Sequence, residues 1–286
     1  MKSNNLSFIA RARDAFFRRL TPKLQDVFRL NGFTDSELRG EISRFSYLKF
    51  VKYSIFDFPF ELGRTVRGVR FNLYSPDAFS SALSIHNPNR FDVEKFSAYI
   101  SNIYSVELSM KIRDKLPILA STQLGSLPLW TMSYPWEDIS PFSKFEDYPK
   151  KVLENRTTYL DADSHINLNQ NFLDPSVFGR SHGLQFAKLL SSINLKGYIP
   201  RSPWPSVFIL FSGQNWRWIM SGSGNHRAYL LNFLNRKSLP SQVVGIVDRK
   251  KLSSWPLVRS GVFDEKSAEQ IFDSIFEGNT SHRGII

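Results

Sequence analysis

The chain contains no cysteine, and this absence removes several classes of site at once. Disulfide frameworks, zinc sites with thiolate ligands and thiol nucleophiles are all excluded. No apolar run approaches the length of about 18 residues that a transmembrane helix needs. The first 30 residues also lack the continuous apolar segment of a secretory signal, because arginines interrupt them. We therefore expect a protein with no transmembrane segment that resides in the cytoplasm.

Other familiar signatures are missing as well. The sequence has no Walker loop, no dinucleotide-binding glycine fingerprint and no His/Asp/Glu set with metalloprotease spacing. It has no internal repeat or low-complexity tract, and no run of five or six basic residues. Its function must therefore be sought in a less common motif.

The composition indicates a globular protein with an anionic partner. The 286 residues are 42% hydrophobic and include 25 phenylalanines, which is enough to build a sizeable core. The net charge of +11 favours a nucleic acid, a nucleotide, a phosphorylated or acidic sugar, or a membrane surface. Charge alone does not choose between these partners.

Residues 1–150 are predicted to be mostly helical. Apolar spacing predicts helices over residues 6–30 and 35–52, the first with a basic outer face. A strand or hairpin is expected around Arg67-Gly68, followed by a helix opened by Asp77 and another over residues 92–115. Residues 117–149 are rich in proline and aromatic residues and are typical of an ordered connecting loop. We place a domain boundary near residue 150.

Residues 151–286 alternate between strand and helix patterns, which predicts an α/β (α+β) fold with a small mixed sheet. The predicted strands are 157–160, 207–211, 216–220 and 242–247, with a hairpin turn at 213–215. The predicted helices are 184–193 and 228–234.

The motif with the clearest chemical meaning lies between the strand 216–220 and the helix after it. It reads Ser221-Gly222-Ser223-Gly224-Asn225-His226-Arg227. A glycine-rich turn that opens a helix presents backbone N–H groups and the positive end of the helix dipole to an anion. His226 and Arg227 are unfavourable at that end of a helix unless a counter-anion is present. The turn therefore predicts a phosphate site, although a simple polar helix cap explains the same residues.

Residues 184–234 as a whole resemble the ParB/sulfiredoxin-like superfamily. The stretch from Leu190 to Pro200 is similar to that family's "L-x-x-S-I-x-x-x-G-x-x-x-P" pattern, and the hairpin after it also matches. The turn at 221–227 resembles the family's "D-G-x-H-R" signature. The resemblance implies a nucleotide-phosphate site at Gly224, Asn225, His226 and Arg227.

Members of that superfamily include chromosome-partition proteins that use CTP, sulfiredoxins that use ATP, and kinases that phosphorylate free serine. Sulfiredoxin chemistry needs a cysteine and is excluded here. The aspartate of the signature is replaced by Ser221 or Ser223, which puts a metal role for that position in doubt. About 40 residues follow residue 245, fewer than the DNA-binding domain of the partition proteins requires.

A kinase of this type needs ATP, Mg²⁺ and a group that accepts the hydroxyl proton. The candidates for catalysis are Asp161, Asp163 and His226, and His165 and His182 are candidates for binding substrate. Kinases of the superfamily have an acidic residue at a comparable early place, and Asp161 and Asp163 match it only by their order along the chain. Both are equally well explained as residues that form a turn. His182 is alternatively a capping or packing residue. No metal ligand set can be named.

Three functions remain open from the sequence. The first is an ATP-dependent kinase that phosphorylates a hydroxyl of a small molecule, an amino acid or a sugar. The second is a ParB-like nucleic-acid-binding protein or nuclease, which the positive charge suits. The third is a non-catalytic nucleotide-sensing or assembly protein. Trp204, Trp216 and Trp218 are candidates for stacking a nucleobase, or else they cover a core.

Overall fold

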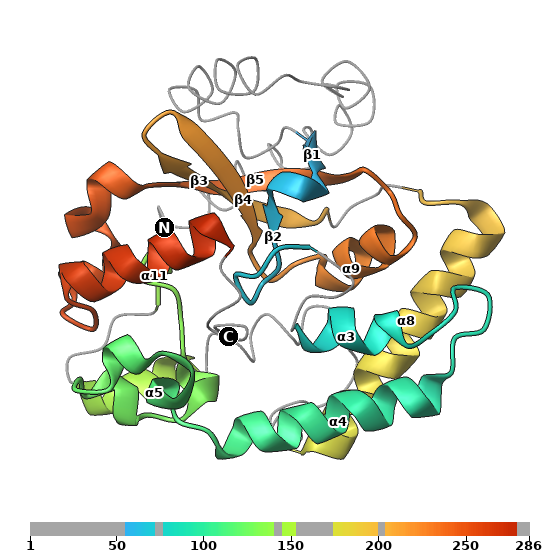
Figure 1. The fold of residues 1–286 in the computed structure, drawn as a ribbon, viewed down its shortest axis with the longest axis horizontal. Coiled ribbons are helices and arrows are strands. Elements are labelled where there is room, and N and C mark those ends of the chain that lie inside the picture. The colour runs from blue at the N-terminus through green and yellow to red at the C-terminus, as the bar shows by residue number, and fades with distance from the viewer. Residues whose placement is uncertain (1–54, 72–76, 140–144, 153–173, 200–203, 279–286) are drawn as a thin grey trace, which may run out of the picture.

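The computed structural model describes residues 55–71, 77–139, 145–152, 174–199 and 204–278. The helices predicted over 6–30 and 35–52 and the strand predicted over 157–160 lie outside these ranges. The described parts form helices around a single mixed sheet (Figure 1), which confirms the predicted α/β class.

Five strands form the sheet, in the order β1-β5-β3-β4-β2. They are β1 (Ile55–Pro59), β2 (Gly63–Arg64), β3 (Ser206–Ser212), β4 (Asn215–Met220) and β5 (Ser238–Asp248). β3 and β4 form the predicted antiparallel hairpin, and β1 runs antiparallel to β5. β5 runs parallel to β3, and β2 runs parallel to β4. The sheet therefore takes strands from both sides of residue 150, while the boundary predicted there stays a prediction.

Longer helices flank the sheet, and short ones connect them. The α-helices are α3 (Ala78–Ser84), α4 (Val93–Ser109), α5 (Ile112–Lys115), α8 (Pro175–Lys196), α9 (Asn225–Phe233), α10 (Pro256–Arg259) and α11 (Glu265–Glu277). The 3₁₀ helices are η2 (Phe60–Leu62), η3 (Pro117–Leu119), η4 (Leu124–Ser126), η5 (Leu129–Thr131), η6 (Phe145–Asp147) and η7 (Arg249–Ser254).

Aspartate side chains begin four of the α-helices. Asp77, Asp92, Asp174 and Asp264 each stand at the N-cap and accept hydrogen bonds from backbone N–H groups of the first turn. Such a cap satisfies donors that have no partner within the helix and is favoured by the helix dipole. The sequence thus fixes where α3, α4, α8 and α11 begin.

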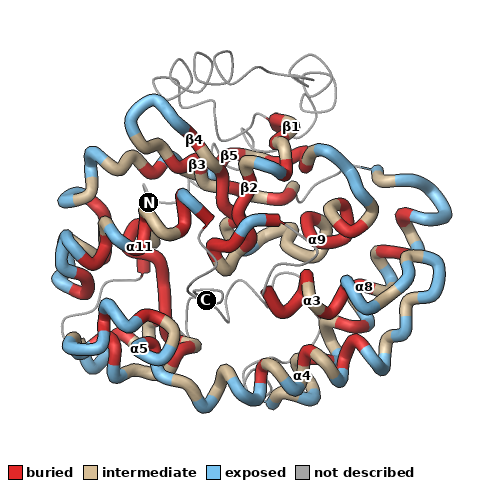
Figure 2. Tube along the Cα trace, viewed as in Figure 1, coloured by how far each residue is buried: buried red, intermediate tan, exposed pale blue. Residues whose placement is uncertain are grey.

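Two hydrophobic cores lie on opposite faces of the sheet, and Figure 2 marks the buried stretches of the elements around it. Val207, Ile209 and Trp218 point to one face, where α3, α4, α8 and α9 complete the core. Leu210 and Ile219 point to the other, which α10, α11 and residues from 112–139 and 145–152 cover. This alternation follows from the two-residue period of a strand. Both cores combine residues from before and after position 150.

Two of the three tryptophans that were candidates for stacking a nucleobase are core residues, whereas Trp204, ahead of β3, is half-buried. Trp216 and Trp218 are 2% and 0% exposed, and the indole Nε1 of Trp218 donates to the Pro59 carbonyl at 2.8 Å. Tyr134 and Trp136 stack in the second core with ring centroids 4.9 Å apart. These side chains bury large apolar areas, so packing accounts for them.

The buried Arg64 joins β2 to the end of α11. Its Nε donates to the carbonyl of Ile275 at 2.7 Å and its Nη2 donates to the carbonyl of Phe276. Burial, together with the nearby Arg217 and Arg70, lowers the pKa of Arg64 to about 9. A cation that caps the last carbonyls of a helix stabilises the negative end of its dipole.

The helices α4 and α8 pack unusually closely because glycines face serines. A Cβ on Gly179 would collide with the Ser101 hydroxyl and the Ser97 carbonyl, and one on Gly183 would collide with the Ser97 hydroxyl. Two interior glycines cost helix propensity, which is why the sequence predicts the helix only from residue 184. The close contact with α4 outweighs that cost, and α8 begins at Pro175.

Three further predictions need correction. His182 lies within α8 rather than ahead of it, and α9 begins at Asn225 rather than at Ala228. The helix predicted over 92–115 is divided by extended backbone at Met110 and Lys111 into α4 and α5. β1 was not predicted at all, since its pairing partner is more than 180 positions away.

We expect Gly179→Val to lower the free energy of unfolding by roughly 2 kcal/mol, because the added side chain must push α8 away from α4. Urea unfolding measures this difference. Lys188→Val, at an exposed position of the same helix, is the matched control and should change the free energy by less than about 0.5 kcal/mol. Equal effects of the two substitutions would contradict the close packing.

Candidate functional site

The glycine-rich turn is held in place by the start of β3. The backbone N–H of Ser221 donates to the Ser206 carbonyl at 2.9 Å, and the N–H of Ser206 donates to the Ser223 carbonyl at 3.1 Å. The hydroxyl of Ser221 donates to that of Ser206 at 2.7 Å, and the hydroxyl of Ser223 donates to the Trp204 carbonyl at 3.3 Å. Both predicted serines thus fix the shape of the turn, and their role in binding a cofactor stays a prediction.

Two glycines give the turn its backbone path. Gly222 has φ of +98° and Gly224 has φ of +84°, both in the region that favours glycine. A Cβ on Gly224 would lie 2.5 Å from the Cα of Pro205, whereas one on Gly222 would meet nothing within 4 Å. Gly224 is therefore needed for packing, and the space beside Gly222 is open.

The N-terminus of α9 lies directly after this turn. Gly224 is the N-cap residue and has no side chain, so no side chain accepts hydrogen bonds from the first N–H groups of the helix. The Nδ2 of Asn225 donates back to the Gly222 carbonyl at 2.7 Å. His226 and Arg227 follow in the first turn, as predicted. The helix end thus combines backbone donors with a cationic side chain, an arrangement that suits an anion.

His226 meets His182 across the space between α9 and α8. The Nδ1 of His182 lies 2.6 Å from the Nε2 of His226. Two neutral imidazole nitrogens at this distance share one hydrogen, so one ring donates and the other accepts. The sequence predicted separate roles for these residues, and the structure brings them together. We call them the histidine pair.

Aromatic rings enclose the histidine pair. The ring of His182 packs edge-on against Phe178 and Phe79, with centroid distances of 4.3 and 5.0 Å. The ring of His226 packs against Phe186 at 4.8 Å. Burial, then the charge of Arg227, lowers the pKa of His226 to about 4. Burial, then His226 and Arg67, lowers the pKa of His182 well below its usual value. Both rings are therefore neutral at pH 7.

A buried polar network lies beside the histidine pair, and the sequence did not reveal it. Arg67 donates two hydrogen bonds to the carboxylate of Glu107 on α4, and its Nε lies 3.9 Å from Asp77 Oδ2. Tyr229 on α9 donates its hydroxyl hydrogen to Asp77 Oδ2 at 2.8 Å. Asp77 Oδ1 accepts from the N–H groups at the start of α3. We call Arg67, Asp77, Glu107 and Tyr229 the buried network.

The charges of the buried network compensate one another. Asp77 is completely buried and Tyr229 is 1% exposed, so unpaired charge at either place would be costly. Burial acts to lower the pKa of Arg67, but Glu107 and Asp77 outweigh it and raise the pKa above its usual value. Burial and Asp77 raise the pKa of Tyr229. Arg67 therefore stays charged and Tyr229 stays protonated.

Three predicted site residues are not placed. Asp161, Asp163 and His165 fall outside the described residues. Within the described ranges, no three His, Asp or Glu side chains gather as a metal site. Asp77, the aspartate of the buried network, already accepts from Tyr229, Phe79 and Ser80. The described residues thus offer groups for a phosphate, and the predicted Mg²⁺ site stays a prediction.

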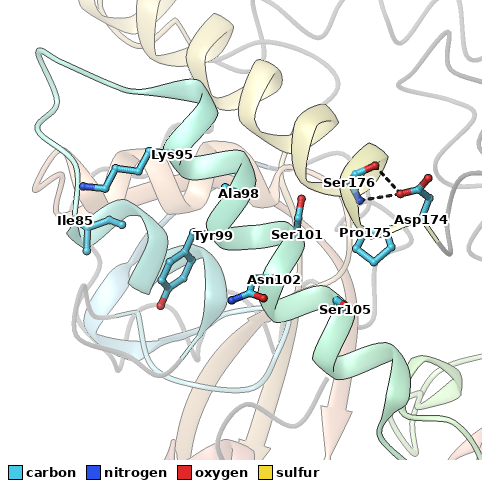
Figure 3. Close-up of a pocket in the computed structure, with 10 residues that line it drawn as sticks. All are labelled: Ile85, Lys95, Ala98, Tyr99, Ser101, Asn102, Ser105, Asp174, Pro175 and Ser176. Carbon is cyan, nitrogen blue, oxygen red and sulfur yellow. Dashed lines mark hydrogen bonds between the residues drawn. The ribbon is translucent and has the colours of Figure 1, made fainter.

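An open groove of about 740 Å³ lies elsewhere, along α4 and the start of α8 (Figure 3). Its lining includes Lys95, Tyr99 and Asn102 from α4, and Asp174 and Ser176 from α8. The carboxylate of Asp174 is occupied by the N–H and the hydroxyl of Ser176. No lining residue belongs to the glycine-rich turn, the histidine pair or the buried network. We regard the groove as the outer margin of the α4–α8 contact.

Comparison with known proteins adds no assignment. The chain matches no protein-family model, no curated protein and no solved structure. In the parts of the chain that the structure describes, no helix has both the length and the apolar character needed to cross a bilayer. The function must therefore be argued from the site itself.

We expect the histidine pair to make the protein sensitive to acid. In the unfolded chain His226 takes up a proton below about pH 6.5, whereas the folded protein resists protonation down to about pH 4. Stability is therefore complete above pH 6.5 and falls as the pH drops through that window. The expected loss from His226 is about 2 to 3 kcal/mol, estimated from its pKa shift.

Urea unfolding at a series of pH values between 7.5 and 4.5 measures this loss. His226→Gln should lose less stability than the wild type over the same range. Lys188→Gln, at an exposed position of α8, is the control and should follow the wild-type profile. A wild type and a His226→Gln variant with parallel pH profiles would refute the assignment.

Proposed function

We propose that this protein binds a nucleotide through its terminal phosphates at the turn 221–227, and that it is an ATP-dependent kinase of a small-molecule hydroxyl. The observation that carries the proposal is the meeting of the N-terminus of α9, Arg227 and the histidine pair at one glycine-rich turn. The helix end and Arg227 favour an anion, and the neutral histidine pair offers a hydrogen-bond donor next to them. His182 comes from α8, 44 positions before His226. The resemblance of residues 184–234 to the ParB/sulfiredoxin-like superfamily supports the same ligand.

The residues of the turn have distinct parts in this proposal. Gly222 leaves the open side along which a phosphate approaches, and the first N–H groups of α9 bind its oxygens. Arg227 neutralises charge and donates in a bidentate manner. ATP, when bound, supplies the phosphoryl group that is transferred.

A hydroxyl acceptor also needs a group that takes its proton. Asp161 and Asp163 are the candidates that the order of elements suggests. The histidine pair is a second candidate, because a neutral pair retains one nitrogen lone pair that is not used between the rings. Its lowered pKa keeps that lone pair available at neutral pH.

Nucleic acid is the second candidate partner, and one observation favours it. The 54 residues ahead of β1 contain 11 Lys or Arg and 5 Asp or Glu, so this segment contributes +6 (11 − 5) of the net charge of +11. Charge of this kind supports contacts to a phosphate backbone that weaken steeply with salt. A non-catalytic nucleotide sensor is the third candidate, and it differs from the kinase only in leaving its ligand unchanged.

We expect ATP, ADP, CTP or GTP at about 100 times its dissociation constant to raise the melting temperature of the wild type by roughly 5 °C or more. Arg227→Ala should bind the same nucleotide at least about tenfold more weakly, because a charge-assisted hydrogen bond is lost. Arg236→Ala, exposed just beyond the other end of α9, is the matched control and should behave as the wild type does. The measurement is a thermal-shift titration, each nucleotide with and without magnesium.

Two results would redirect the assignment. If no nucleotide shifts the melting temperature, the phosphate site is wrong. If a duplex oligonucleotide then binds with an affinity that falls steeply between 50 and 200 mM salt, nucleic acid replaces the nucleotide as the partner.

For the kinase itself, we expect ATP to be consumed only when a small hydroxyl compound is present. Asp161→Ala and Asp163→Ala should each be tested, and loss of the proton acceptor should lower kcat about 100-fold or more while ATP binding survives. Asp138→Ala, an exposed aspartate outside the site, is the control. A panel of amino acids and sugars with product detection by ³¹P NMR makes the measurement. ATP binding without turnover for any acceptor would favour the sensor.

A further inference from the structure

The histidine pair has a fixed number of hydrogen positions. One hydrogen lies between His182 Nδ1 and His226 Nε2. Each ring also has an outer nitrogen, Nε2 of His182 and Nδ1 of His226. When both rings are neutral, one outer nitrogen carries a hydrogen and the other carries a lone pair. When the pair gains one proton, both outer nitrogens become donors.

The outer nitrogens make no hydrogen bond to the described part of the chain. Neither is among the buried polar atoms without a partner, so each keeps some exposure to solvent. His226 stands in the first turn of α9, directly after the glycine-rich turn. A ligand that reaches these nitrogens breaks no hydrogen bond seen in the structure.

The charged groups around the pair cancel. Arg67, from the segment between β2 and α3, and Arg227, from α9, are the charged groups that act on the pair. Arg67 is joined to Asp77 and to Glu107 on α4, and Asp77 to Tyr229 on α9. Two arginines are balanced by two carboxylates, and the tyrosine is protonated. The elements α3 and α8 contribute the rings of Phe79, Phe178 and Phe186. With a neutral pair, the charged side chains named here sum to zero, so a phosphate dianion gains a further positive charge only when the pair takes up a proton.

We propose that the site binds the terminal phosphate of its ligand together with one proton from solvent, which the histidine pair holds between its two rings. This inference rests on the proposed nucleotide-binding function and adds to it a proton that the ligand requires. The negative phosphate supplies the charge that makes protonation favourable inside the aromatic enclosure, and both outer nitrogens then donate to it. No covalent bond forms or breaks in this step.

Two consequences follow for the ligand. Affinity strengthens as the pH falls, by about tenfold per pH unit, in the interval between the pKa of the free pair and that of the occupied pair. A terminal phosphate with two negative charges also binds better than a phosphodiester with one, because the second charge is what stabilises the protonated histidine pair. The site therefore selects the end of a nucleotide over the backbone of a nucleic acid.

The test is the number of protons taken up when ATP binds in the absence of magnesium. Isothermal titration calorimetry at pH 7 in three buffers of different ionisation enthalpy gives this number. The comparison is between the wild type and the double variant His182→Gln/His226→Gln, so that protons gained by ATP itself cancel. We expect the wild type to take up close to one proton more than the double variant. Arg236→Ala should match the wild type.

The outcomes separate this inference from the proposed function. If ATP binds and both proteins take up the same number of protons, the histidine pair does not hold the proton and the inference is overturned, while nucleotide binding stands. If the wild type does not bind ATP at any pH, both fall. If the double variant fails to fold or to bind, ¹⁵N NMR of the wild-type histidine rings decides. Hydrogens on three of the four ring nitrogens with ATP bound, both outer nitrogens among them, support the inference, and an outer nitrogen that keeps its lone pair overturns it.

Discussion

The buried carboxylate of Asp77 joins parts of the chain that are far apart in the sequence. One oxygen begins α3 by accepting two backbone N–H groups, and the other accepts the hydroxyl hydrogen of Tyr229 from α9. Arg67 lies beside that second oxygen and is held in turn by Glu107 on α4. Because removing one member of such a network leaves an uncompensated charge away from water, these elements are constrained to fold together.

The site inherits its geometry from this constraint. Tyr229 and His226 are three positions apart on α9, so they share a helix face, and fixing one fixes the direction of the other. On the opposite side, Gly179 and Gly183 seat α8 against α4, which places the intervening His182 toward α9. The distance between the two imidazoles therefore follows from two packing contacts outside the pair.

The parts of the fold that depend on residues close together in the sequence were the predictable ones. The hairpin of β3 and β4, the cap at Asp77 and the turn into α9 depend on neighbouring residues, and the sequence indicated all of them. The hairpin expected around Arg67-Gly68 is present, with β2 on one side and an antiparallel bridge from Arg64 to Arg70. β1 was not predicted, because it is short and pairs with a strand distant along the chain. The start of α8 was misplaced because its glycines predict a break, whereas the contact with α4 keeps them helical.

The candidate site divides in the same way between contiguous residues, which the sequence indicated, and distant ones, which it did not. The turn and its His226-Arg227 are contiguous, so their pattern could be read directly. His182 was expected near the turn, but its partner could not be named. Arg67, Asp77 and Glu107 are separated by tens of residues and have no shared motif, so only the fold reveals that they meet.

The glycines of the turn show which part of it points to a ligand. Gly224 is fully explained by the fold, since its positive φ and its contact with Pro205 both exclude a side chain. Gly222 has the same kind of backbone but nothing beside it. The open side of the turn is therefore at Gly222, ahead of the uncapped N–H groups of α9. A phosphate approaching there meets backbone donors first and the side chains of the first turn next, so the helix end supplies affinity and the histidine pair supplies its dependence on pH.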